Sequence, residues 1–116
     1  MAPILSSPRT FLVWLYTVSH GQLLLRANPT AEDGERIEVL FKDVHTMSVS
    51  TRMDGLTITE EYSDAPRPAG APRTFHLEGP AYRGAVIAGA VFVHRDRESY
   101  DAPSGFAHSL PERVWR

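Results

Sequence analysis

The sequence predicts an all-β fold of about seven antiparallel strands, arranged as a small flattened barrel or sandwich with a short C-terminal helical turn. Several segments alternate between apolar and polar residues, which is the period of a half-buried strand. Glycine and proline interrupt the chain at intervals that suit a β meander, and the one good helix signal lies near the C-terminus. Such a pattern is satisfied by two packed sheets or by one closed sheet, and periodicity does not distinguish them.

The first predicted hairpin joins two apolar runs, 10–18 and 23–26, through the polar stretch 19–22, which contains a glycine. Successive side chains of a strand point to opposite faces, so both faces of the first run can be read from the sequence. Both faces are apolar, so we expect a cover on each side, either another layer of the same fold or a second protein chain. The two faces carry Phe11, Val13 and Leu15 on one side and Leu12, Trp14, Tyr16 and Val18 on the other.

Turn signals divide the rest of the chain. Asp54-Gly55 is typical of a hairpin turn, and the proline-rich stretch 63–73 is predicted to be a loop. The run at 84–94 is apolar on both faces, and its glycines and alanines would allow a close approach by another segment. We expect the remaining strands at 36–42, 44–51, 56–62, 73–78 and 84–94.

The C-terminus carries the capping-box spacing Ser109-Leu-Pro-Glu112, which predicts a short helix over 109–116. So short a helix is not stable alone, and Trp115 would have to dock on the sheet. The length and the lack of a composition shift predict a single β domain over 1–116.

Composition excludes several classes of function. The net charge of -2 and the scattered cations argue against nucleic-acid binding. Eleven of the twelve basic residues are arginines, and Lys42 is the one lysine. The absence of cysteine excludes disulfides and thiolate chemistry and fits a cytoplasmic protein. The longest apolar run is far shorter than the roughly 20 residues that cross a membrane, so we expect no membrane partner.

Three residues are candidates for ligand binding. Glu60 and Tyr62 fall on the apolar face of the strand 56–62, where an unpaired carboxyl group would have the raised pKa of a general acid or base. The alternative is that Glu60 lies at the rim and meets solvent or an arginine. His76 is the third candidate. No two of the five histidines have a metal-site spacing, so we expect no metal and no cofactor. The alternative is a three-ligand site assembled by the fold, with His76 and Glu78 as two of its ligands.

The layout is similar to that of short bacterial β-domain proteins, a resemblance that implies no activity. No nucleophile elbow or phosphate-binding loop is present. We therefore expect a non-catalytic protein-interaction or self-association module, a homodimer in its simplest form, with Trp14 and Tyr16 as interface candidates. The alternative is a small-ligand-binding β-barrel, with an enzyme using Glu60 and His76 as one form of it.

Overall fold

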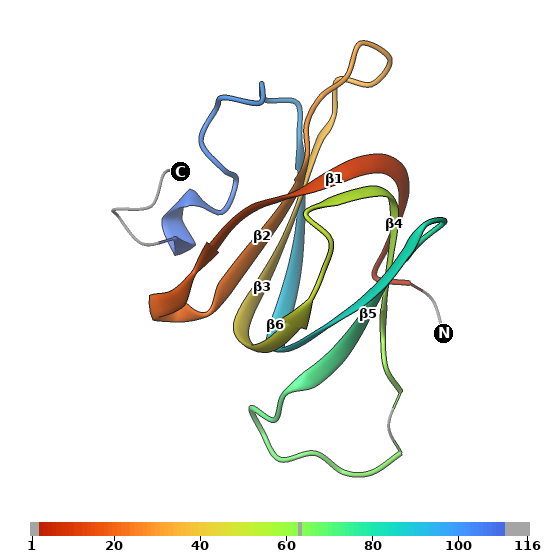
Figure 1. Cartoon of the computed structure of the whole chain (residues 1–116). Coiled ribbons are helices and arrows are strands. Elements are labelled where there is room, and N and C mark those ends of the chain that lie inside the picture. The colour runs from red at the N-terminus through yellow and green to blue at the C-terminus, as the bar shows by residue number, and fades with distance from the viewer. Residues whose placement is uncertain (1–2, 63, 111–116) are drawn as a thin grey trace.

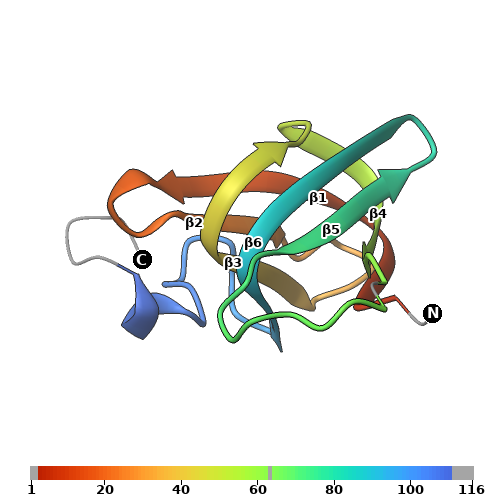
Figure 2. The ribbon, with the colours of Figure 1, turned by 90° about the horizontal axis from the view of Figure 1, so that it is seen from below.

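The computed structural model describes residues 3–62 and 64–110. Six antiparallel strands pair in the order β1-β2-β3-β6-β5-β4, and β4 pairs back onto β1. One sheet thus closes into a ring-like, flattened structure of 45 × 35 × 20 Å (Figures 1 and 2), which confirms the all-β prediction. The strands are β1 (Leu5–Thr17), β2 (Gln22–Ala27), β3 (Arg36–Ser48), β4 (Arg52–Glu60), β5 (Arg73–Gly79) and β6 (Tyr82–Asp96).

The main hydrophobic core fills the inside of the ring. Directly opposed residues of antiparallel strands share a face, so pairs such as Leu25 with Val39 bring inward side chains together. Phe41 and Phe75 meet edge to face, with their ring centroids 5.5 Å apart. The core residues are at most 3% exposed: Leu5, Phe11, Leu23, Leu25, Ala27, Ile37, Val39, Phe41, Met53, Leu56, Ile58, Phe75, Leu77, Val86 and Ala88.

The described residues form six strands instead of about seven because the predicted strands 36–42 and 44–51 are one strand, β3. Asp43 lies between them with a φ of 55°, a conformation that aspartate tolerates better than most residues. The strand bends there and continues beside β6. Gly89 leaves room for the Asp43 side chain, because a Cβ at that position would lie 3.1 Å from the Cβ of Asp43.

The prediction of a hairpin turn at Asp54-Gly55 is wrong. Both residues lie inside β4, and β3 is connected to β4 by residues 49–51. Gly55 does have a positive φ of 81°. It takes up a one-residue register shift between β4 and the Ser7–Thr10 part of β1, so the glycine serves a bulge instead of a turn.

A second irregularity corrects the predicted faces of β1. Val13 opposes Leu25 but Leu15 opposes Leu24, so Trp14 is an extra residue in the strand. Beyond this bulge the faces exchange. Trp14 and Leu15 both pack outside the ring, against Leu24, Leu40, Phe106 and Leu110. Tyr16 instead opposes Leu23 of the inner core and is 39% exposed. Trp14 and Tyr16 therefore do not share a face.

The cover on the outer face of β2 and β3 comes from the same chain. Residues 97–110, which we call the C-terminal strap, run back along the side of the ring formed by β2, β3 and β6 (Figures 1 and 2). All six residues of β2 are buried: Leu23, Leu25 and Ala27 belong to the inner core, and Leu24 packs with Phe106 and Leu110 of the strap. The strap ends in a single 3-10 turn, η2 (Ala107–Ser109). The helix predicted over 109–116, with Trp115, lies outside the described residues after Leu110.

Truncating the side chain of Leu24 tests whether the strap covers the outer face of β2. Its side chain is fully buried although it points out of the ring, so Leu24→Ala should destabilise the protein by about 2–5 kcal/mol, as a core truncation does. Urea unfolding measures this. Tyr62→Ala, at an exposed position, should change stability by less than about 0.5 kcal/mol. A Leu24→Ala effect as small as that of Tyr62→Ala would show that the strap does not cover this face.

Candidate functional site

A buried group of charged side chains lies on the outer face of β2 and β3. The side chains of Arg26 and Glu38 are 0% exposed and that of Arg36 is 1% exposed. Glu38 Oε2 accepts hydrogen bonds from Arg26 Nε at 3.1 Å and Nη2 at 2.9 Å. Arg36 donates from Nε and Nη2 to the two carboxylate oxygens of Asp96, at 2.9 and 2.8 Å. Two arginines and two carboxylates therefore neutralise one another.

The backbone of the strap is held by those donors and acceptors of the charge cluster that are not used within the cluster itself. The amide of Gly105 donates to Glu38 Oε1 at 2.7 Å. The two guanidinium groups donate to backbone carbonyls of the strap at 3.0 to 3.4 Å. The acceptors are Tyr100 for Arg26, and Ser99, Ala102 and Pro103 for Arg36. Because carbonyls accept these protons, a polar backbone segment can lie on the sheet without losing its hydrogen bonds.

The pKa shifts follow from this packing. Burial lowers the pKa of Arg26, although Glu38 opposes that shift. For Asp96 burial favours the neutral form, but the hydrogen bonds and charge of Arg36 outweigh it and lower the pKa. The Arg26 guanidinium also lies 4.2 Å from the centre of the Trp14 ring, a cation–π contact that closes the cluster on its β1 side.

Between the strap and the sheet runs a groove of about 240 Å³. Its floor includes Phe92, which remains 46% exposed, and Lys42 Nζ lies 5.7 Å from the centre of that ring. On the strap side, Phe106 meets the ring of His94 edge to face. A side chain at position 105 would overlap the His94 ring, so glycine lets the strap come this close. The lining residues are Leu40, Lys42, Phe92, His94, Gly105, Phe106 and His108.

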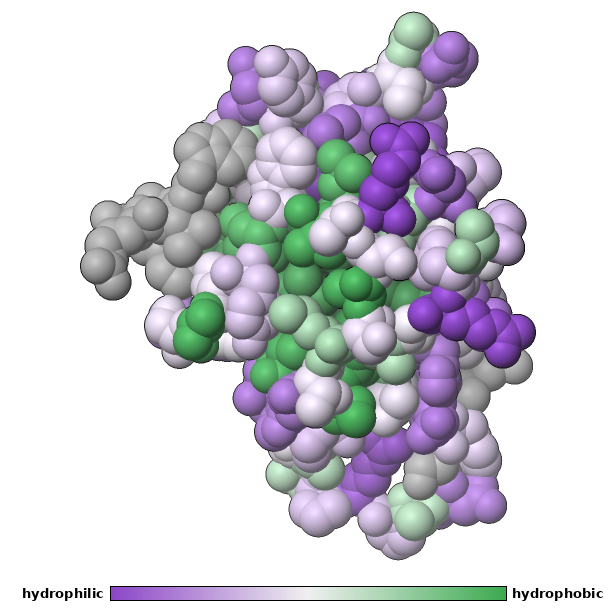
Figure 3. All heavy atoms as spheres, in the orientation of Figure 1, coloured by the Kyte–Doolittle hydropathy of each residue, from purple (hydrophilic) through white to green (hydrophobic). Residues whose placement is uncertain are grey.

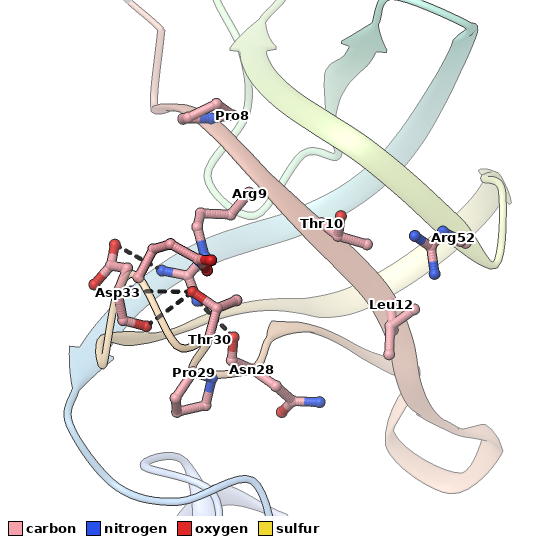
Figure 4. A pocket seen from close by; sticks show the side chains of 10 residues that line it. Pro8, Arg9, Thr10, Leu12, Asn28, Pro29, Thr30, Asp33 and Arg52 are labelled. Atoms are coloured by element: carbon pink, nitrogen blue, oxygen red, sulfur yellow. Dashed lines mark hydrogen bonds and ion pairs between the residues drawn. The ribbon is translucent and has the colours of Figure 1, made fainter.

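A larger depression of about 490 Å³ lies where β1 meets the connection between β2 and β3 (Figure 4). Arg9 points to Asp33 and to the Asn28 carbonyl there, at 2.9 and 2.5 Å, and also donates to the Glu35 carbonyl at 2.8 Å. Three acceptors occupy this guanidinium, so its role is to fix the 28–35 connection against β1. The groove beside the strap, in contrast, has an apolar floor that nothing in the described chain covers.

The ligand-binding candidates from the sequence do not form one site. Glu60 lies at the end of β4, 3.4 Å from Arg73 Nη1, as the rim alternative predicted. It opposes Phe75 of the inner face, whereas His76 belongs to the outer face and contacts Glu61 Oε1 at 3.0 Å. Tyr62 is 71% exposed beyond the strand. Of the interface candidates, Trp14 is half-buried and packs against the small outer cluster that includes Leu110 of the strap. Tyr16 is exposed.

Sequence reasoning missed both the charge cluster and the groove. In the alternating segment 36–42, Glu38 and Lys42 face away from Ile37, Val39 and Phe41, and the structure places Glu38 on the outer face and Lys42 in the groove outside the ring. No periodic signal in 97–110 indicates that this segment folds back over Glu38. Isolated charges within apolar strands, such as Arg26 after three leucines, were the available signal, because a buried charge requires a partner.

Comparisons with models of protein families, with curated proteins and with solved structures gave no match. Within residues 3–62 and 64–110, no group of three or more histidine, aspartate or glutamate side chains is arranged to hold a metal ion. No helix among these residues has the length and apolar character needed to span a membrane. The site must therefore be interpreted from its own chemistry.

Replacing Glu38 tests the charge cluster. Glu38→Gln keeps the shape but leaves two buried arginines facing one remaining carboxylate, so the free energy of unfolding should fall by about 3–5 kcal/mol in urea titrations. Glu35→Gln is the matched control, because it removes a more exposed ion pair with Arg95 and should cost less than about 1 kcal/mol. Equal effects of the two substitutions would refute the structural role of Glu38.

Acid should weaken the attachment of the strap. The pKa of Asp96 is lower in the folded than in the unfolded chain, so its stabilisation is complete above the ordinary aspartate pKa of about 3.9. It is lost as the pH falls through the lowered value. The stability difference between the wild type and Asp96→Asn should therefore shrink on acidification below about pH 4. A difference that is independent of pH would show that the ion pair with Arg36 contributes nothing.

Proposed function

We propose that this chain is a non-catalytic protein-binding module, and that the groove beside the strap receives an apolar side chain of its partner. The observation that carries the proposal is the exposed ring of Phe92 in a concave surface whose opposite wall is Phe106. Aromatic side chains in pockets are typical anchoring points of protein interfaces. The walls are preorganised, because the charge cluster fixes the strap, and a fixed groove loses little entropy on binding.

The arrangement of the other polar groups supports the non-catalytic form of this proposal. Arg26, Arg36, Glu38 and Asp96 already bind one another and the strap. Glu60 and His76 lie on opposite faces of the sheet. The small-ligand alternative, including an enzyme that uses Glu60 and His76, therefore has less support, and the core side chains occupy the inside of the ring.

Peptide selection on the whole protein tests the proposal. A random peptide library displayed on phage is panned on the immobilised chain, and the selected peptides are measured by fluorescence polarisation. Phe92→Ser should weaken their binding at least about tenfold, as loss of an anchoring contact does. Tyr62→Ser, at another exposed aromatic residue, should leave it unchanged. No enrichment, or equal binding to both variants, would overturn the proposal.

Self-association is the second candidate function, and a different surface supports it. Tyr16 and Met47 are 39% and 42% exposed although they oppose core residues. Val44 donates its amide hydrogen to the Gly21 carbonyl, which sets this part of β3 beside the β1–β2 turn. Figure 3 shows hydrophobic side chains gathered in the centre of the face seen in Figure 1. A second copy of the chain would cover this end.

Native mass spectrometry tests self-association. The wild type should be a dimer at micromolar concentration, and Met47→Glu should give a folded monomer because a buried, unpaired carboxylate is costly in an interface. Tyr62→Glu, at another exposed aromatic residue, should remain a dimer. A monomeric wild type would exclude self-association and leave the proposal for the strap groove intact.

A further inference from the structure

We infer that the segment bound in the strap groove is acidic as well as apolar, with a carboxylate beside the side chain that contacts Phe92. This inference rests on the proposed function and specifies its partner. The lining combines three apolar side chains with Lys42, His94 and His108, and it includes no carboxylate. A lysine beside an apolar floor is complementary to a segment that carries both an apolar group and a negative charge.

Lys42 is the central cation of this argument. Its ammonium group lies over the Phe92 ring, and no carboxylate of the described residues lies within 4 Å of it. The aspartate of β3 and the aspartate of β6 both have partners other than Lys42. Asp43 faces His45 at 3.4 Å, and Asp96 is bound by Arg36 and by His94 Nε2. Among the described residues, no carboxylate therefore pairs with Lys42.

The geometry also restricts the spacing within the ligand. Because Lys42 Nζ is 5.7 Å from the centre of the Phe92 ring, a carboxylate bound to Lys42 lies close to whatever covers that ring. An extended peptide rises about 3.3 Å per residue, so side chains one or two positions apart are separated by about 3 to 7 Å along the chain. We therefore expect Asp or Glu within two positions of a Leu, Phe or Trp in the bound segment.

Aligning the peptides selected on the wild type, and measuring a double-mutant cycle, tests the inference. The alignment should place an acidic residue within two positions of the apolar anchor. Replacing that residue by its amide should weaken binding to the wild type by about 3–10-fold, and raising the salt concentration should reduce this effect. Against Lys42→Gln the same replacement should have no effect, because the interaction is gone. Arg67→Gln, at an exposed position between β4 and β5, is the matched control and should retain the full difference.

The outcomes separate this inference from the function it rests on. If the peptides lose affinity with Phe92→Ser but their acidic residues are absent or replaceable without effect, the acidic partner is wrong and the protein-binding groove stands. If the amide replacement costs as much against Lys42→Gln as against the wild type, another cation binds the carboxylate and the assignment to Lys42 is overturned. If Phe92→Ser binds as the wild type does, both proposals fail.

Discussion

The structure depends on one buried carboxylate, that of Glu38, between the guanidinium groups of Arg26 and Arg36. Moving such charges out of water is costly, and replacing a whole buried ion pair by apolar residues is often neutral or stabilising. What the charges contribute is direction, since further donors and acceptors of the cluster bond to the backbone of the strap. The cluster therefore selects one path for the C-terminal segment, which a purely apolar surface would not do.

The path of the strap determines how the sheet is covered. It buries the outer face of β2 and β3 under Phe106 and Leu110, so the ring has a second, smaller core outside the first. The strap runs beside Phe92 without covering it. This leaves a concave surface in which one wall is sheet and the other is strap. The fold and the candidate site thus have a common cause in the charge cluster, and a change at Glu38 should affect both.

The strand pattern was predictable because alternation reports which way a side chain faces along a regular strand. It failed at irregular positions, where the left-handed conformation of Asp43 joined two predicted strands and the bulge at Trp14 turned Tyr16 to the other face. Alternation gives the outward direction of Glu38 but not its burial, because that burial depends on a segment 67 residues away, at Gly105. The groove could not be predicted, since its residues come from three distant parts of the chain.

Native-state amide hydrogen exchange, followed residue by residue by NMR, tests the central claim most directly. Attachment by Glu38 predicts that the Gly105 amide opens only when the protein unfolds, with the same protection free energy as the amide of Leu25 in the core strand β2. An amide of Gly105 that exchanges several orders of magnitude faster than that of Leu25 would contradict this. The strap would then open independently of the ring, and the charge cluster would not hold it.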